Sequence, residues 1–248
     1  MHPGQKLQKK LLGGAGRAIA DYGMIADGDR VMVGLSGGKD SYVLLDILLE
    51  LRRRAPVRFD LLAVNIDPKR PGYSPQPLEE HCASRDVPLC MVQRDIYPAV
   101  RRIVPQGDTD CSLCSRLRRG ALYSLAIEEK CGKIALGHHA DDILQTFLLN
   151  ILFEGKPRGM APFLESADGR NTVIRPLAYC WESDIGAYAS LQGYPIIACG
   201  QCGSGENLRR RRMQRLLDDL QREIPQVRHS MLAAVCRLPG MGRGACRD

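Results

Sequence analysis

A short loop with the sequence SGGKDS, at positions 36–41, combines the groups that bind a chain of phosphates. Its glycines allow a tight turn with exposed backbone N–H groups, its serines add hydroxyl donors, and its lysine adds a cation. The candidate phosphate-binding residues are Ser36, Gly37, Gly38, Lys39, Asp40 and Ser41. A Walker-type loop would need Ser or Thr after Gly-Lys and a glycine five positions before Gly38, where this sequence has Asp40 and Val33.

Asp40 is the residue that sets this loop apart chemically. A carboxylate at this position repels phosphate unless it holds a magnesium ion or caps the following helix. Both roles fit a strand–loop–helix unit that binds a multiply charged phosphate. A glycine turn that carries charged residues and binds nothing is the alternative interpretation.

Two Cys-x-x-Cys pairs form a second candidate site. Cys111 and Cys114 fall at the start of a predicted helix, where both thiols share one face with Arg118. The helix N-terminus and the guanidinium group favour thiolates, which bind metals or attack electrophiles. The second pair, Cys199 and Cys202, lies too far along the chain for a self-contained zinc knuckle, so the fold would have to bring the pairs together.

Three kinds of chemistry fit these cysteines. Four thiolates could hold a structural zinc, three could hold an iron–sulfur cluster with an open iron, and two could form a redox disulfide. The spacing alone favours zinc. The other cysteines lack a pairing pattern, so we expect small buried apolar groups or surface thiols at Cys82, Cys90, Cys131, Cys180, Cys236 and Cys246.

A third polar motif, HHADD at positions 138–142, follows a predicted strand. The carboxyl ends of parallel strands meet at one edge of a sheet, so we expect His138, His139, Asp141 and Asp142 near the glycine loop. There they could orient a nucleotide, a magnesium ion or a target base. Helix capping by an aspartate and local packing of a histidine are the alternative interpretation.

Arginine is concentrated in clusters at positions 52–54, 116–119 and 209–212, in a chain whose formal net charge is +7. Clustered arginine suits a phosphate backbone, and solvated helix faces are the alternative. Aromatic residues make up 5% of the chain and do not alternate with the basic ones. The sequence therefore indicates no base-stacking platform, and favours recognition of a nucleic acid by shape and charge.

Alternating strands and helices must position these motifs. Strands are expected at 30–36, 59–67, 88–95, 133–139 and 171–179, and helices at 5–23, 41–54, 78–86, 108–132, 141–155, 181–194 and 206–223. This order predicts an α/β fold with a doubly wound, mostly parallel sheet and helices on both faces. We expect an N-terminal helical segment at 1–28, a catalytic domain at 29–224 and a C-terminal tail with disordered parts at 225–248.

The composition of 44% hydrophobic and 25% charged residues is typical of a soluble globular protein. No apolar run approaches the roughly 20 residues of a membrane span. The N-terminus has lysines followed by a short glycine-rich stretch, unlike a secretory signal. We therefore expect a cytoplasmic protein without a membrane partner, whose paired cysteines serve metal or redox chemistry.

The motifs GLSGGKDSY, CSLCSRLRRG, KIALGHHADDILQT, VIRPLAYC and CGSGENLRR, in this order, resemble the tRNA 2-thiocytidine biosynthesis (TtcA) family of PP-loop ATP pyrophosphatases. The resemblance covers roughly residues 6 to 235. It implies the PP-loop, adenine nucleotide alpha hydrolase-like fold and an ATP- and Mg²⁺-dependent tRNA-cytidine 2-sulfurtransferase. The C2 oxygen of an anticodon-loop cytidine, position 32, would be adenylated and then replaced by sulfur to give 2-thiocytidine.

The resemblance also implies roles for individual residues. A 4Fe-4S cluster would be held by Cys111, Cys114 and Cys202, with Cys199 as a neighbour. The implied catalytic residues are Lys39, Asp40, Arg118 and Asp142, and His138 and Asp141 would join the loop in binding ATP. The tRNA contacts would come from Arg116, Arg119, Arg209 and Arg210. Ala140 stands where we expect an arginine in this family.

A cysteine desulfurase is the sulfur source that the resemblance implies, and a homodimer is compatible with it. Two alternative functions remain compatible with the sequence. One is a PP-loop tRNA-modifying ligase of the lysidine synthetase or 2-thiouridine type. The other is a zinc-stabilised RNA-binding protein whose loop has no catalytic role.

Overall fold

The computed structural model describes residues 3–103, 111–197 and 205–241, and shows a mixed sheet with the strand order β3-β2-β1-β4-β6-β5. The strands are β1 (Asp29–Gly34), β2 (Phe59–Asp67), β3 (Leu89–Gln93), β4 (Lys133–Ala135), β5 (Phe163–Glu165) and β6 (Thr172–Ile174). All neighbours pair in parallel except β5, which pairs with β6 in antiparallel orientation. The order reverses at β1, which has β2 on one side and β4 on the other, so a ligand site is expected beyond the end of β1.

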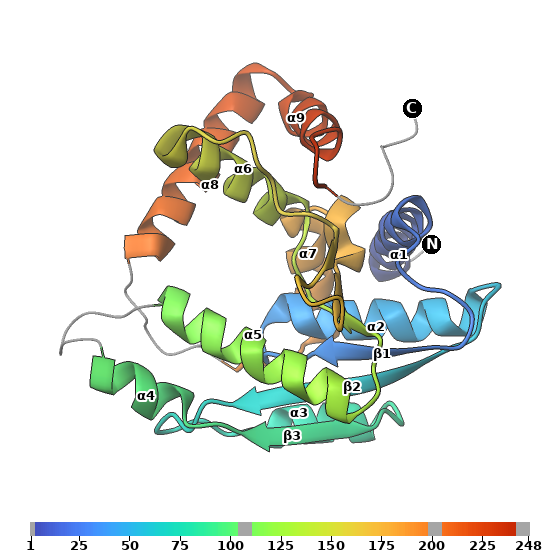
Figure 1. The fold of residues 1–248 in the computed structure, drawn as a ribbon. Helices are drawn as coiled ribbons and strands as arrows, with labels where there is room; N and C mark the ends of the chain where they lie inside the picture. Colours follow the sequence, from blue (N-terminus) through green and yellow to red (C-terminus); the bar gives the residue numbers. More distant parts are fainter. Residues whose placement is uncertain (1–2, 104–110, 198–204, 242–248) are drawn as a thin grey trace.

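Helices cover both faces of this sheet (Figure 1). They are α1 (Pro3–Tyr22), α2 (Lys39–Arg54), α3 (Gln76–Ala83), α4 (Ile96–Ile103), α5 (Cys111–Glu128), α6 (Ala140–Glu154), α7 (Glu182–Gln192), α8 (Gly205–Glu223) and α9 (Val227–Cys236), with a short 3-10 helix η1 (Pro176–Tyr179). The doubly wound α/β fold predicted from the sequence is confirmed.

Alternate residues of the strands face two separate cores. Val31 and Val33 of β1 pack in one core with the buried faces of α2 and α3, whereas Met32 packs in the other with Leu122 of α5. Side chains in a strand point alternately to opposite faces, so strands buried on both faces must be apolar almost throughout. This explains the continuous apolar runs of the sequence.

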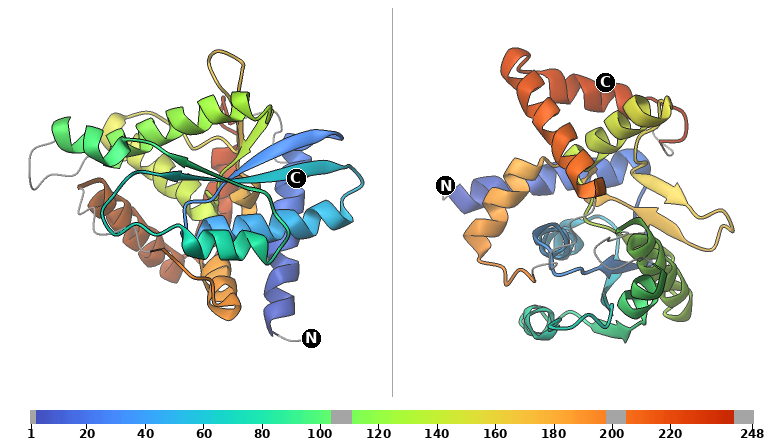
Figure 2. Two further views of the ribbon diagram at one scale, coloured as in Figure 1. Left: turned by 90° about the horizontal axis from the view of Figure 1, so that it is seen from below. Right: turned by 90° about the vertical axis from the view of Figure 1, so that its left-hand side faces the viewer.

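The helices near both chain ends pack into the larger core. α1 contacts η1, α7 and α2. Helices α8 and α9 pack on α6, on the side of α6 that faces away from β1, β2 and β3 (Figure 1; Figure 2). Leu11 of α1 and Val235 of α9 are almost fully buried in it. The division at positions 28 and 224 stays a prediction. Among the described residues, no helix is both long and apolar enough to cross a membrane.

Several elements differ from the sequence expectations. Helices α4 and α9 and strand β5 were not expected, and α9 lies inside the segment predicted as a tail. The expected strand at 171–179 ends at Ile174 because Pro176 opens η1, and the one at 133–139 ends at Ala135. Helix α5 ends at Glu128 rather than near Gly132, because Lys130 adopts a left-handed φ of 54°.

Candidate active site

The SGGKDS loop joins the end of β1 to the start of α2 and is held by its own hydroxyl groups. The backbone N–H of Ser36 donates to Oγ of Ser41 at 3.2 Å, and that hydroxyl donates to the carbonyl of Gly38 at 2.8 Å. Gly37 has a φ of +82°, and a Cβ atom there would lie 2.9 Å from Cβ of Ile197. Glycine is thus required at position 37 both by the backbone conformation and by the close approach of Ile197.

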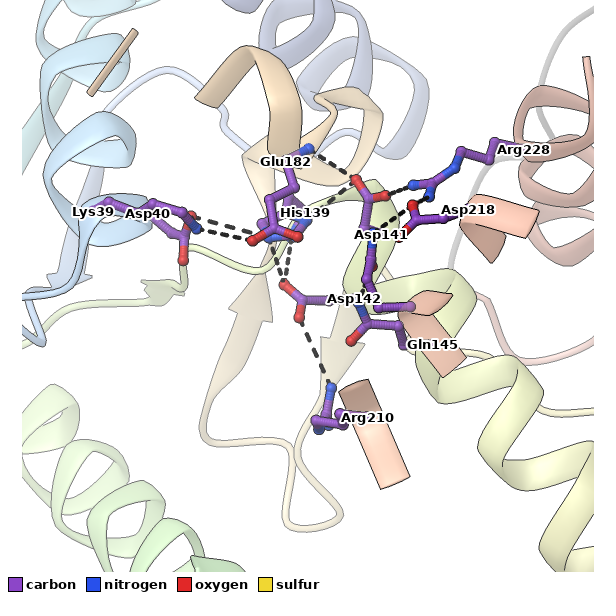
Figure 3. Close-up of polar contacts among 11 residues, drawn as sticks. Lys39, Asp40, His139, Asp141, Asp142, Gln145, Glu182, Arg210, Asp218 and Arg228 are labelled. Atoms are coloured by element: carbon purple, nitrogen blue, oxygen red, sulfur yellow. Dashed lines mark hydrogen bonds and ion pairs between the residues drawn. The ribbon is translucent and has the colours of Figure 1, made fainter. Parts of the chain in front are cut away.

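Two carboxylates surround the lysine of this loop. Nζ of Lys39 lies 2.7 Å from Oδ1 of Asp40 and 3.3 Å from Oε1 of Glu182, the first residue of α7 (Figure 3). Burial lowers the pKa of Lys39, but the two carboxylates outweigh it and the pKa lies above its usual value. The lysine is therefore charged, and it bridges the loop to α7. No role for Glu182 is predicted by the sequence, since only the fold brings this residue to the loop.

A cavity of about 350 Å³ opens beside the loop, at the carboxyl ends of β1, β2 and β4. The predicted site residues that line it are Ser36, Asp40, Ser41, Arg118, Arg119, His138 and Asp142. The loop after β4 approaches the start of α2 very closely, because a Cβ at Gly137 would lie 3.0 Å from the carbonyl carbon and oxygen of Asp40. The structure thus brings the loop, the HHADD motif and the arginines of α5 around one space.

A Gly137→Ala substitution is expected to lower nucleotide-dependent turnover on the order of tenfold, because the new methyl group would push His138 and Asp142 away from Asp40. Turnover is compared with that of Gly132→Ala, since a Cβ at Gly132 would meet no heavy atom within 4 Å. Equal turnover of the two variants would show that the close approach at Gly137 is not needed.

The two histidines of the motif occupy different environments. Burial is the main reason that the pKa of His138 falls to about 4, and the positive charge of Arg175 adds to it, so its imidazole is neutral near pH 7. Nδ1 of His138 is buried and has no hydrogen-bond partner among the described residues. His139 is the N-cap residue directly before α6, and its backbone N–H donates to Oδ2 of Asp142 at 3.1 Å. His138 is therefore the histidine that can offer a neutral ring to a ligand in the cavity.

Asp141 lies away from the cavity and holds helices together. Its side chain is only 1% exposed, and its carboxylate pairs with the guanidinium group of Arg228 in α9 (Figure 3). The same carboxylate accepts the backbone N–H of Glu182 at 2.8 Å, and Arg228 also contacts Asp218 of α8 at 2.6 Å. Asp141 thus fixes the start of α7, where Glu182 contacts Lys39.

The arginines of the candidate site fall into two groups. Arg118 and Arg119 line the cavity, and Nε of Arg118 is buried without a hydrogen-bond partner among the described residues. Arg210 lies 3.8 Å from Oδ1 of Asp142, so α8 reaches the cavity rim. Arg116 and Arg209 are exposed and do not line the cavity.

Arg175, at the end of β6, is a buried cation that the sequence analysis missed. Its guanidinium group donates to the carbonyl of Ala161, and its Nε atom is buried without a partner among the described residues. Burial is the main reason that the pKa of Arg175 falls to about 10, and the positive charge of the nearby Arg119 lowers it further. The only signal in the sequence was its place directly after a strand. Arg175 and Arg119 add positive potential beside His138.

The cysteines are described only in part. Cys111 is the first residue of α5 and Cys114, on the same first turn, is half-buried, whereas Cys199 and Cys202 lie outside the described residues. Among the residues that are described, no group of three His, Cys, Asp or Glu side chains could hold a metal ion. Cys82, Cys131, Cys180 and Cys236 are buried, one of the two outcomes expected from the sequence, whereas Cys90 is half-buried and Cys246 lies outside the described residues. Burial raises the pKa of Cys82 to about 11 and that of Cys180 to about 12, so neither is a reactive thiolate at neutral pH.

These features define a PP-loop nucleotide-binding protein, and a family model described as the PP-loop domain matches residues 9–198. The tRNA-cytidine(32) 2-sulfurtransferase of Bordetella petrii is 54% identical over 237 residues, which cover 96% of this chain and 73% of that protein. The enzyme of that name from Hahella chejuensis is 53% identical over 230 residues, which cover 93% of this chain and 81% of that protein. The chain belongs to the tRNA-cytidine(32) 2-sulfurtransferase family, as its motifs indicated.

Solved structures share the fold at lower identity. The U34-tRNA thiolase NcsA from Methanococcus maripaludis, determined with its 4Fe-4S cluster, superposes with a TM-score of 0.73 at 21% identity, covering 94% of this chain and 78% of that one. The NMN synthetase of Francisella tularensis superposes with a TM-score of 0.51 at 17% identity, covering 96% and 98%. At these identities the comparisons support the fold alone.

Proposed function

We propose that the protein is an ATP-dependent tRNA-cytidine 2-sulfurtransferase that converts cytidine 32 of its tRNA substrate to 2-thiocytidine. The observation that carries the proposal is the cavity beside an intact PP-loop, in a chain 51–54% identical to enzymes of that name. Arginines from α5 and α8 reach the same cavity, as a polyanionic substrate requires.

ATP would activate the base at this loop. The O2 atom of the cytidine attacks the α-phosphate, the bond to the β-phosphate oxygen breaks, and pyrophosphate leaves. A sulfide equivalent then forms the bond to C2, and AMP departs with the original O2 atom. Lys39 and the loop amides stabilise the charge that develops on pyrophosphate, once Lys39 exchanges a carboxylate for phosphate oxygens.

The cavity residues have complementary roles in this proposal. Asp40 would hold Mg²⁺. The space between the carboxylates of Asp40 and Glu182 suits a cation, because the ammonium group of Lys39 already lies there. Arg118 is assigned to the α-phosphate or AMP, since its unpartnered Nε is buried at the cavity. The neutral His138 would contact the nucleotide or target base, with Asp142 beside it. Asp141 acts through Glu182, as a positioning residue.

We infer that Cys111, Cys114 and Cys202 would hold a 4Fe-4S cluster with one open iron. Cys111 and Cys114 lie on the first turn of α5, three positions apart at a helix N-terminus, and the next turns carry the cavity arginines. Residues 194–197, which lead to Cys202, pack against the loop: Ile197 donates its N–H to the carbonyl of Gly37 at 2.9 Å. When bound, the cluster would supply the iron that carries the incoming sulfur.

A cysteine desulfurase as sulfur source, a cytoplasmic location and a homodimer complete the proposal. The first two are proposed because the reaction needs a sulfur donor and an intracellular tRNA, and the homodimer is proposed as the assembly compatible with the family resemblance.

Anaerobically purified protein is expected to contain about four irons and four acid-labile sulfides per chain. It should form 2-thiocytidine in tRNA only with ATP, Mg²⁺ and a sulfide source, as measured by nucleoside mass spectrometry. Cys202→Ala should lose the iron, and Cys199→Ala, the matched control in the same segment, should keep it.

Two results would contradict the proposal. One zinc without labile sulfide would favour the zinc-stabilised alternative and remove the sulfur-delivery role of the cysteines. Consumption of ATP with transfer of an amine instead of sulfur would favour the lysidine synthetase type.

A further inference from the structure

An aromatic ring and a guanidinium group stack on the surface at the C-terminal end of α6. Cζ of Arg209 in α8 lies 5.1 Å from the centroid of the Phe153 ring, within the range of a cation–π contact. Phe153 is 51% exposed although it is a large aromatic residue. The two residues are far apart in the sequence, so no spacing pattern indicates that they form a stacked pair.

The surface around this pair is both apolar and cationic. Leu152 is 58% exposed and Leu208 is 70% exposed. Arg212, three positions after Arg209 on α8 and therefore its neighbour on the helix surface, is exposed as well, and within the described part of the chain it forms no ion pair. A ring face beside unpaired arginines suits a nucleotide, whose base stacks while its phosphate meets a positive charge.

The stacked pair is connected to the cavity by the two helices that carry it. Arg210, the residue after Arg209, contacts Asp142 at the cavity, and Asp142 lies on the same helix as Phe153. The helical rise from position 142 to 153 is about 16 Å, the length of about five stacked nucleotides. The C-terminal end of α6 and the N-terminal ends of α5 and α8 lie on one side of the molecule (Figure 1; Figure 2, right).

We propose that Phe153 and Arg209 form a base-stacking platform for an unpaired nucleotide of the RNA substrate while the target base occupies the cavity. The inference rests on the proposed function, because it assumes an RNA substrate with a single-stranded loop. Unpaired loop bases are the part of a folded RNA that can stack on aromatic side chains. The platform would hold the loop open and fix the register of the nucleotides that enter the cavity.

The test measures the affinity of wild type, Phe153→Leu and Phe153→Tyr for the tRNA and for its anticodon stem-loop, at one salt concentration. Phe153→Leu should weaken binding five- to 100-fold, as expected for the loss of one base–aromatic stack, and Phe153→Tyr should keep it. A stem-loop with 2-aminopurine in the loop should show quenched fluorescence with wild type and not with Phe153→Leu. ATP binding and the melting temperature should stay unchanged, because the ring is at the surface.

Leu152→Ala is the matched control, because it removes an equally exposed apolar side chain without a ring. Wild-type affinity of Phe153→Leu, or equal losses for a fully paired RNA, would overturn the platform. So would a change in oligomeric mass in Phe153→Leu, which would show that the patch binds a second copy. If wild type binds the loop through Phe153 but forms no 2-thiocytidine, the proposed function fails and the platform stands. If Phe153→Leu binds and thiolates tRNA like wild type, the platform fails and the proposed function stands.

Discussion

A Lys39→Ala variant is expected to lose between 100- and 1000-fold in ATP-dependent 2-thiocytidine formation, the effect of removing one group that stabilises developing charge in a water-excluded site. Lys39 is the cation of the loop, and its Nζ lies between two carboxylates, one of which ATP phosphates would replace. Affinity for tRNA should change less than about twofold, because Lys39 lies in the phosphate loop and is not one of the arginines expected to contact tRNA. Nucleoside mass spectrometry and a filter-binding assay measure the two quantities.

Lys9→Ala provides the control for the loss of one lysine, because Lys9 is exposed on α1. Undiminished thiolation by Lys39→Ala would exclude the loop from the reaction. A parallel loss of tRNA affinity would instead place Lys39 in RNA binding and leave its role with pyrophosphate unsupported.

Arg228→Met is expected to lower the free energy of unfolding by about 3 kcal/mol. The change leaves the carboxylate of Asp141, only 1% exposed, without its cationic partner in the core. Because Asp141 also accepts the N–H of Glu182, the start of α7 should loosen and the KM for ATP should rise. Urea unfolding and initial rates at varied ATP concentration measure the two effects.

Arg222→Met is the matched control on the neighbouring helix, since the ion pair of Arg222 with Asp219 is exposed at 77% and 61%. Its cost should stay below about 0.5 kcal/mol. The double variant Asp141→Asn, Arg228→Met should recover part of the stability, because it removes the unpaired charge. Equal losses for Arg228→Met and Arg222→Met would show that the buried pair contributes no more than an exposed one.

The placement of the phosphate loop could be predicted because it depends on local order. A strand, a glycine-rich loop and a helix in succession put residues 36–41 at the carboxyl edge of a parallel sheet, where the structure has them. The same reasoning correctly brought His138 and Asp142 to that edge. Sequence order does not show which residues of HHADD face the cavity, because adjacent residues of a helix point in different directions. The packing of α7 and α9 determines which of these side chains lie away from the cavity.

The parts that sequence reasoning missed all depend on contacts between distant segments. Glu182 and Arg175 reach the cavity region because β6 lies next to β4, and no spacing rule connects them with the loop. Arg228 lies in α9, within a stretch read as a tail, and its partner Asp141 is on a different helix. The stacking of Arg209 on Phe153 likewise needs the crossing of α6 and α8.

The packing of residues 194–197 on the phosphate loop has a consequence for how the protein folds. Tyr42 donates its hydroxyl to the carbonyl of Pro195 at 3.1 Å and stacks on Tyr194, while Ile197 covers Gly37. These contacts join two segments separated by most of the chain, so their formation carries a larger loop-closure cost than the local contacts of the β1–α2 unit. We therefore expect the segment that leads to Cys199 and Cys202 to dock late, after the phosphate loop has formed as its template.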